Sequence, residues 1–407
     1  MNILKNYAST ILLLFGILVG GILGMVFGED AVVVKPIGDI FLNFMYVLVV
    51  PIVCLSVSSA MCQMTRSNMI GKVLVNTLLI FVVMSVVAAV LSYLCILIYN
   101  PMAMVDSSSV VLEGAVVADN SMSPGEMFVN TLTVPEFLQL FEKPHLLPLI
   151  IFSVIFGFAV AGCGEKGEFI AHLLSSGTSV VLKMMDYLMY VAPLCLGCYF
   201  AATIGSMGSQ IVSGFMGSFV LFLVLTLIFF FPVNTIYVFI SGGKNAVKSF
   251  WKNMLTPSLT AIATSSSAAC ISVNIDACKK MGVSENIASS VIPFGTNIHK
   301  DGSVVSAIIK VVFLLTIFGG QSGFEMNGLT VILTALVSSM VVGAIPSGGM
   351  TGELLICSIL GFSPELAGAL LVISTIVDVP ATLLNSTGNI VASVMVDSFS
   401  KKQNTDQ

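Results

Sequence analysis

Three short polar patches interrupt the long apolar runs of this 407-residue chain, and they hold many of the side chains that could do chemistry. The first is TSSSAAC, a run of three hydroxyls between apolar residues. Serines in an apolar helix often pack against a neighbouring helix or bond back to the preceding turn. Three in succession favour a binding role, so Ser265, Ser266 and Ser267 are candidate ligands for a polar molecule.

The second patch is PFGTNIHKDGS at residues 293–303. It contains three residues that loosen or break a helix, Pro293, Gly295 and Gly302. They predict a local unwinding, which frees backbone carbonyls to bind an ion. His299, Lys300 and Asp301 lie within this patch. Lys300 and Asp301 are either a neutralised buried pair or, with His299, members of an ion-coupling site.

The third patch is a polar stripe in STIVDVPATLLNSTGNIVAS, near the end of the chain. Its members recur at spacings of 4, 4, 3 and 4: Ser374, Asp378, Thr382, Asn385 and Asn389. These spacings place all five side chains on one face of a helix. A carboxylate in so apolar a helix is costly without a cation or a donor. Asp378 is therefore a candidate binding residue, and the alternative is a structural carboxylate that caps another helix.

The elements that position these patches follow from composition. The chain is 57% hydrophobic and 9% charged, whereas about a quarter of the residues of a soluble domain carry charge. A helix needs about 20 apolar residues to cross a membrane. Runs that can span the bilayer, or enter and leave it, lie near residues 8–27, 38–61, 73–99, 147–162, 175–204, 211–241, 284–318, 327–360 and 364–396. We therefore expect an all-α polytopic membrane protein.

The distribution of charge predicts the orientation in a plasma or inner membrane. Residues 106–142 contain acidic side chains and no Lys or Arg, which indicates an external segment. Both termini are then cytoplasmic, and the first apolar run is a retained helix because no small-residue cleavage site follows it. The net charge of −5 has no basic cluster, which argues against nucleic acid as a partner. The nine cysteines are scattered and fit small buried hydrophobes.

Two segments predict re-entrant hairpins, at about 245–278 and about 325–363. Each enters apolar, is interrupted by Ser, Gly or Pro near its middle, and leaves apolar. Irregular backbone at membrane depth must be buried in protein or line a watery cavity. Two interrupted segments in corresponding places indicate the central substrate site of a transporter. Glu353, in the return arm of the second hairpin, is either a proton carrier or a residue of an aqueous vestibule.

Together these motifs resemble one family, the dicarboxylate/amino acid:cation symporters, which include archaeal aspartate and animal glutamate transporters. The resemblance covers nearly the whole chain, through TSSSAACIS, PFGTNIHKDGS, GAIPSGGM and DVPATLLNSTGN in that order. It implies eight transmembrane helices plus two opposed re-entrant hairpins, in a homotrimer that works as an elevator. The scaffold would be residues 1–71 and 101–204, and the transport domain 72–100 and 205–397. Residues 398–407 would be a cytoplasmic tail.

The resemblance also implies residue roles. Asp378 matches the aspartate that binds the substrate amine, Asn385 the asparagine at the α-carboxylate, and Thr382 a neighbouring threonine. The full expected substrate set is Ser265, Ser266, Ser267, Ile345, Pro346, Ser347, Asp378, Ala381, Thr382 and Asn385. The expected ion-coupling set is Ser85, Gly295, His299, Lys300, Asp301, Asn385 and Asn389. Glu353 and His299 are the possible proton carriers.

Departures from the family pattern suggest which substrate is carried. Ala381 stands where members that carry acidic substrates have an arginine. A buried carboxylate without its bidentate partner costs several kcal/mol. We therefore expect a small neutral substrate such as alanine, serine, threonine or cysteine. The alternative is aspartate or glutamate, held by a partner that the sequence does not reveal, and dicarboxylates without an amine fit worse because Asp378 repels them.

The ion sites depart from the pattern as well. His299 stands in place of an asparagine, Lys300 of a methionine and Asn389 of an aspartate, while Asp301 is kept. Lys300 would place a tethered ammonium where an ion would sit. We expect coupling to sodium at reduced stoichiometry or to protons, with no other cofactor. A channel would need a repeated polar lining, and a serine hydrolase a base beside the serines, so we expect a transporter and not an enzyme.

Overall fold

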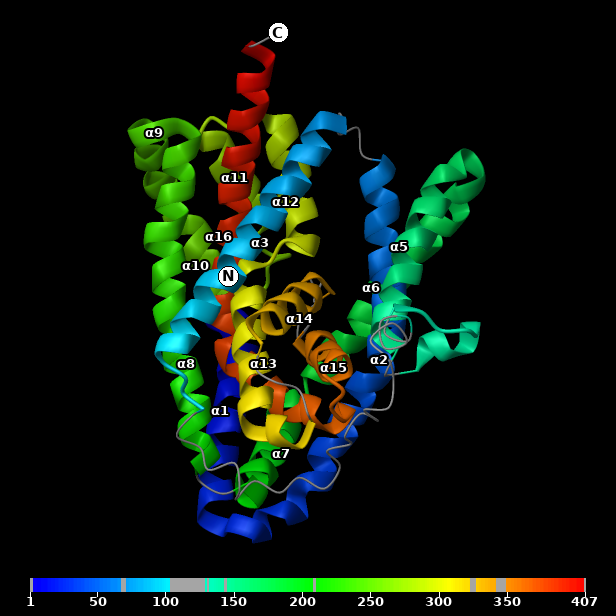
Figure 1. The fold of residues 1–407 in the computed structure, drawn as a ribbon, viewed down its shortest axis with the longest axis vertical. Helices are drawn as coiled ribbons and strands as arrows, with labels where there is room; N and C mark the ends of the chain where they lie inside the picture. Colours follow the sequence, from blue (N-terminus) through cyan, green and yellow to red (C-terminus); the bar gives the residue numbers. More distant parts are fainter. Residues whose placement is uncertain are drawn as a thin grey trace.

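The structure, a computed structural model, describes residues 3–66, 71–102, 129, 132–142, 145–207, 210–322, 327–341 and 349–405. These residues form helices joined by short connections, and no strand occurs among them (Figure 1). The first half contains α1 Ile3–Phe27, α2 Lys35–Arg66, α3 Gly71–Ile98, α5 Leu146–Gly162, α6 Glu168–Met189 and α7 Ala192–Met207. A 3-10 turn, Gly28–Val34, joins α1 to α2.

The second half begins with α8 Gln210–Ile228 and α9 Asn234–Asn253, joined by a π turn that contains Pro232. The remaining helices are α10 Leu255–Thr264, α11 Ile271–Lys280, α12 Glu285–Ile298, α13 Asp301–Ser322, α14 Gly328–Val341, α15 Gly349–Ile359 and α16 Ala367–Thr405. A π turn accommodates a proline because it relaxes the hydrogen-bond ladder that the ring would break. Within α9 the backbone kinks at Gly242 and Gly243, where φ of Gly243 is 62°.

Several helices have the length and apolarity of membrane spans. Among the described residues these stretches are Ile11–Gln63, Val73–Ile98, Val212–Asn253, Glu285–Phe318 and Pro364–Lys401, and the first covers most of both α1 and α2. The pair Gly164–Met189 and Ala192–Ser206, bent by 64°, makes up one further candidate. The expected all-α polytopic membrane fold is confirmed.

Two pairs of helices are too short to span. The arms α10 and α11 have 10 residues each, and α14 and α15 have 14 and 11. At about 1.5 Å per residue no single arm reaches the roughly 30 Å of a hydrocarbon core, and the two arms of each pair pack against each other. These are the two predicted re-entrant hairpins. The tip of the second, with Ile345, Pro346 and Ser347, lies outside the described residues.

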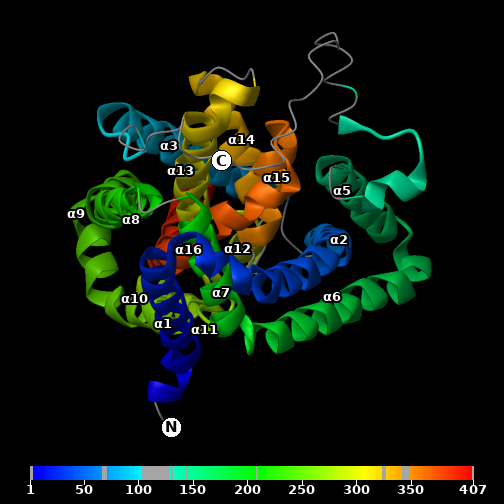
Figure 2. The same cartoon turned by 90° about the horizontal axis from the view of Figure 1, so that it is seen from below.

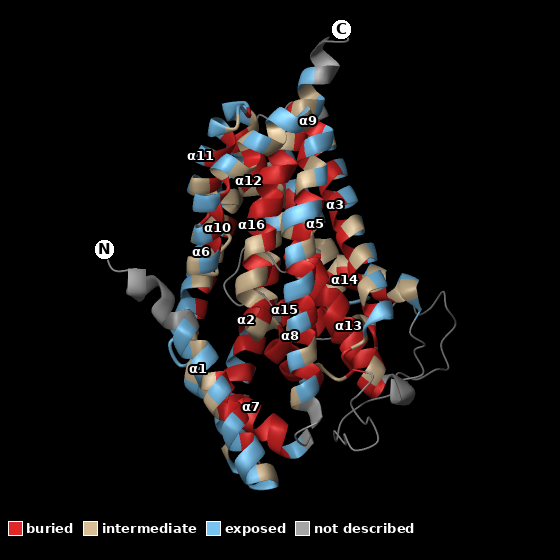
Figure 3. Cartoon of the chain, turned by 90° about the vertical axis from the view of Figure 1, so that its left-hand side faces the viewer, coloured by how far each residue is buried: buried red, intermediate tan, exposed pale blue. Residues whose placement is uncertain are grey.

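The centre of the molecule is formed by α12, α13 and α16 (Figure 2). No residue of α16 from 367 to 398 is exposed, and α13 is buried on every side along most of its length (Figure 3). A helix buried all round must carry its polar side chains to internal partners. The polar stripe of α16 is therefore positioned inside the protein, as its spacing predicts. The division into scaffold and transport domain stays a prediction.

Two contacts fix the helices around this centre. A Cβ on Gly16 or Gly20 of α1 would lie 2.1 Å from a carbonyl oxygen of α7, so these helices meet backbone to backbone. At the other end of the molecule, Asp397 of α16 caps α12. Its Oδ1 accepts from the backbone N of Ser284 at 3.1 Å and from its Oγ at 2.6 Å, while Lys401 Nζ donates to Oδ2 at 2.6 Å.

Candidate functional site

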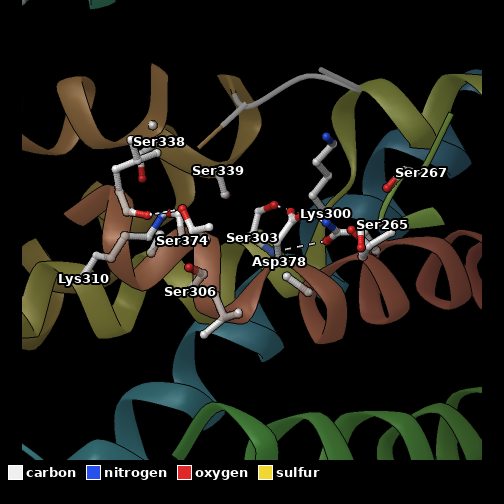
Figure 4. A pocket seen from close by; sticks show the side chains of 18 of the residues that line it. Ser265, Ser267, Lys300, Ser303, Ser306, Lys310, Ser338, Ser339, Ser374 and Asp378 are labelled. Carbon is white, nitrogen blue, oxygen red and sulfur yellow. Dashed lines mark hydrogen bonds between the residues drawn. The ribbon is translucent and has the colours of Figure 1, made fainter. Parts of the chain in front are cut away.

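A cavity of about 120 Å³ lies where the first hairpin, the start of α13 and the middle of α16 meet. It brings together most of the predicted substrate residues: Ser265, Ser266, Ser267, Asp378, Ala381, Thr382 and Asn385. Lys300 lines the same cavity. Figure 4 shows Ser265, Ser267 and Lys300 near one end, with Asp378 between them and the centre. The hairpin tip and the helical stripe therefore do form one site.

The hairpin tip owes its shape to its own hydroxyls. Ser265 ends α10 in the left-handed conformation, with φ 46° and ψ 31°, and it is the one non-glycine residue with positive φ among those described. Thr264 Oγ1 accepts from the backbone N of Ser266 at 3.3 Å, and Ser266 Oγ accepts from the backbone N of Ala269 at 3.3 Å. Ser266 is therefore partly used in holding the turn, while Ser265 Oγ is buried without a partner.

The predicted unwinding occurs between α12 and α13, at His299 and Lys300. His299 is extended, with φ −106° and ψ 115°, and its backbone N donates to the carbonyl of Gly295 at 2.8 Å. The break sends neighbouring side chains in different directions. Lys300 enters the cavity, while Asp301 contacts His299. The interpretation of Lys300 and Asp301 as a buried pair with each other is therefore wrong.

Lys300 and Asp378 are the two charged groups at this end of the cavity. They interact electrostatically with each other. Within the described part of the chain, neither makes a hydrogen bond or a close ion pair through its side chain. A carboxylate without a donor at this depth is costly, so it favours a ligand with a positive group. Asp378 is available for such a ligand.

Asn385 and Thr382 supply neutral groups beside this pair. Asn385 Oδ1 accepts from the backbone N of Ser303 at 3.2 Å, and its Nδ2 donates to Ser303 Oγ at 3.3 Å. One Nδ2 proton is left, because an amide has two. Gly302 explains how closely α13 and α16 cross here, since a Cβ on it would lie 2.3 Å from the carbonyl oxygen of Ala381.

The other predicted ion residues form a separate cluster behind the cavity. His299 Nδ1 lies 3.1 Å from Asn389 Oδ1, and His299 Nε2 lies 3.1 Å from Asp301 Oδ1, although the latter contact is not aligned as a hydrogen bond. The imidazole stacks on Phe81 of α3, with ring centroids 4.5 Å apart. Gly295 admits this arrangement, because a Cβ there would lie 2.3 Å from Asn389 Oδ1.

The remaining two ion candidates lie apart from one another. Ser85 is buried on α3, one turn after Phe81, so it lies on the side of the histidine cluster. Asn385 instead lines the cavity with the substrate candidates.

The histidine cluster contains polar atoms without partners. Among the described residues, Asp301 Oδ1 and Asn389 Nδ2 are buried and have no hydrogen-bond partner. The cluster thus has unsatisfied polar atoms of both kinds.

A further charged cluster lies at the opposite end of the cavity, and sequence reasoning missed its lysine. Lys310 Nζ contacts Glu353 Oε1 at 2.5 Å and donates to Ser374 Oγ at 2.7 Å, and Ser374 Oγ donates to Glu353 Oε1. Glu353 is thus tied to a cation rather than placed in an open vestibule. A lone lysine inside the apolar run SAIIKVVFLL was the available signal, because a charge at that depth needs a partner.

These features define a class of protein: a polytopic membrane protein with two opposed hairpins around a buried polar site, which is the arrangement of a secondary transporter. Residues 10–399 match the sodium:dicarboxylate symporter family, and the chain belongs to that family. It is a symporter and not an enzyme, and it uses a coupling cation.

Two relatives align over nearly the whole chain. A C4-dicarboxylate transport protein of Bacillus subtilis (strain 168) is 24% identical over 403 residues, which cover 97% of this chain and 94% of that protein. A C4-dicarboxylate transport protein of Rhizobium leguminosarum is 25% identical over 399 residues, which cover 97% of this chain and 89% of that protein. The recognition of the family from its motifs is therefore confirmed.

Proposed function

We propose that the protein imports a neutral amino acid together with a cation. The observation that carries the proposal is the Asp378 carboxylate, which lines the cavity and accepts no hydrogen bond from any residue that the structure describes. A substrate ammonium would supply the missing hydrogen-bond donors. Asn385, Thr382 and the hairpin tip would supply neutral donors for the α-carboxylate, as a zwitterion requires in a dry site. A small side chain of the alanine, serine, threonine or cysteine type is compatible with Ala381.

The charge balance of the cavity supports a zwitterion. Lys310 is already balanced by Glu353, and Lys300 balances Asp378. The cavity therefore sums to zero charge. A neutral amino acid keeps that sum, with its ammonium at Asp378 and its carboxylate at the neutral donors. A substrate with two carboxylates and no amine adds two negative charges beside Asp378, which is unfavourable at low dielectric.

Lys300 favours a second candidate, a substrate with an additional carboxylate. It provides a cation close to Asp378, where the DVPAT stretch itself has none. Aspartate or glutamate would place its side-chain carboxylate there, and a C4-dicarboxylate, which the names of the two relatives suggest, would place either end. This candidate needs Lys300 to bind substrate rather than to neutralise Asp378.

Two matched variants separate these candidates. Alanine, serine, aspartate and succinate are titrated against the purified protein, with and without sodium, while thermal stabilisation is measured. We expect alanine and serine to stabilise the wild type and Lys300→Met, and to fail with Asp378→Asn. If succinate or aspartate stabilises the wild type and loses its effect in Lys300→Met, the second candidate holds. Unchanged alanine binding in Asp378→Asn would refute the role of Asp378 with the amine.

The coupling ion is proposed from the histidine cluster. The His299 imidazole lies between Asp301 and Asn389. It fills space in which a cation could otherwise bind to the Asp301 carboxylate. We propose reduced sodium stoichiometry or proton coupling through His299, Asp301 or Glu353. Uptake into proteoliposomes with imposed sodium or pH gradients tests this. A sodium dependence as steep as that of a carrier coupled to three sodium ions would contradict both alternatives.

The wider architecture belongs to the same proposal. From the resemblance we infer a homotrimer with cytoplasmic termini, in which residues 72–100 and 205–397 move as an elevator against the rest. The backbone contact between α1 and α7 is compatible with a stiff scaffold. Mass measurement of the detergent-solubilised protein tests the trimer. A monomer that transports at full rate would contradict it.

A further inference from the structure

The cavity continues well beyond the group that binds an amino-acid head. Figure 4 shows Lys310, Ser374 and Ser338 at the end away from Lys300, with Ser306 and Ser339 between. Ser374 precedes Asp378 by one helical turn, about 6 Å along α16. The cavity has a volume of about 120 Å³ and reaches from Lys300 to Lys310. The side chain of alanine or serine would leave the far end unfilled.

The far end has spare hydrogen-bonding capacity of both kinds. Lys310 has three protons, and Glu353 and Ser374 take two of them. Ser338 Oγ donates to the carbonyl of Ala335 at 3.2 Å and Ser339 Oγ to that of Leu336 at 2.9 Å, which leaves their lone pairs free to accept. Glu353 itself lies behind the cavity lining, and its Oε2 has no hydrogen-bond partner among the described residues. This end therefore offers a donor and several acceptors.

Its charge decides what kind of group suits it. Lys310 and Glu353 cancel, so a group with net charge would be buried without a counter-ion. An apolar group would leave the free donor and acceptors unpaired and deprived of water, which is unfavourable. A neutral group that both donates and accepts meets neither penalty.

We propose that this end of the cavity is a side-chain subsite for a neutral group that donates and accepts hydrogen bonds. The chemistry is that of a terminal carboxamide or of a second α-amino-acid head, and Lys310, Ser338 and Ser374 are the residues that select it. The inference rests on the proposed function, because Asp378 holds the amine at the first end. It deepens that function by giving the transported amino acid a longer polar side chain.

The wild-type protein gives the first test. Glutamine, the near-isosteric methionine, alanine and cystathionine are titrated, and dissociation constants are measured by calorimetry. We expect glutamine or cystathionine to bind at least ten-fold tighter than methionine. A preference for glutamine identifies the carboxamide, and a preference for cystathionine identifies the second head. If methionine or alanine binds as tightly as both, the subsite does not exist. If no amine-bearing compound binds, the proposed function itself has failed.

A paired variant gives the second test. Lys310→Met with Glu353→Gln removes the charges together, so that no buried charge is left alone. The matched control is Lys183→Met with Asp186→Asn, an exposed pair 3.3 Å apart on α6. We expect the preference for the polar side chain to fall below about three-fold in the first variant and to stay in the control. An unchanged preference in the first variant would overturn the assignment of Lys310, and the wild-type comparison decides the proposal if that variant does not fold.

Discussion

At the scale of single residues, the site depends on which neighbour each charged side chain faces. Lys300 and Asp301 are adjacent in sequence, yet one enters the cavity and the other contacts His299. The two-residue break between α12 and α13 produces this separation, because side chains of an extended segment point to opposite sides. Asp378 and Lys300 thus face the cavity, while His299 and Asp301 form a group of their own.

Gly295 tests the histidine cluster. In Gly295→Ala the new methyl would lie 2.3 Å from Asn389 Oδ1 and 2.9 Å from the Phe81 ring. Overpacking of this kind costs about 1–3 kcal/mol, and we expect a lower melting temperature together with a weaker dependence of uptake on the coupling ion. Gly162→Ala, where a Cβ meets nothing within 4 Å, is the control. If uptake depends on the coupling ion to the same extent in both variants, the histidine cluster does not take part in coupling.

At the scale of elements, a buried cluster ties α15 to α13 and α16. Lys310 lies on α13, Glu353 on α15 and Ser374 on α16. The stripe on α16 was predictable, because residues three and four positions apart lie on the same face of a helix, and a short stretch of sequence shows this spacing. The pairing of Lys310 with Glu353 was not, because it joins residues 43 apart through the packing of two helices. The choice of partner for Lys300 likewise depends on the direction of the helix break.

A double-mutant cycle measures the cluster. Lys310→Met alone leaves Glu353 buried without its cation, and we expect a loss of about 3–5 kcal/mol of stability. Lys310→Met combined with Glu353→Gln should recover most of that loss, because the uncompensated charge is gone. Thermal and denaturant unfolding in detergent provide the measurement. Additive losses in the double variant would mean that the two side chains act independently.

Asp397 provides a test at the end of α12. Asp397→Ala removes the acceptor for both donors of Ser284. Loss of a cap costs about 0.5–2 kcal/mol, so we expect a lower melting temperature with unchanged substrate affinity, because the residue lies far from the cavity. Asp186→Ala, an exposed carboxylate with one surface partner, should change stability by less than about 1 kcal/mol. Equal effects of the two substitutions would argue against the cap.

At the scale of the whole molecule, the charge carried per cycle follows from the cavity. A neutral amino acid adds no net charge, so the coupling cation alone makes the cycle electrogenic. With one sodium or one proton, we expect each 59 mV or so of inside-negative potential to raise the accumulation ratio about ten-fold. Proteoliposomes with imposed potassium-diffusion potentials measure this ratio. If the accumulation ratio does not change with the membrane potential, the protein does not carry a neutral substrate together with one monovalent cation.

The whole fold was more predictable than the site. Apolar run lengths and interrupted segments predicted a polytopic protein with two re-entrant hairpins, because lipid leaves the backbone few other solutions. The cavity required the depth and direction of each helix, which no local pattern records. Lys310 is the example: its place in an apolar run marks it as unusual, but only the packing of α15 against α13 supplies its counter-ion.

The cap at Asp397 has a kinematic consequence. α16 is fastened to α12 at Ser284 and again at His299, through Asn389. On α16 the two anchors, Asn389 and Asp397, are eight residues apart, about 12 Å along the helix. Two separate attachments restrict the rotation of α16 relative to α12. In the proposed elevator movement, we therefore expect Asp378 and His299 to travel together, with the geometry between the cavity and the histidine cluster unchanged.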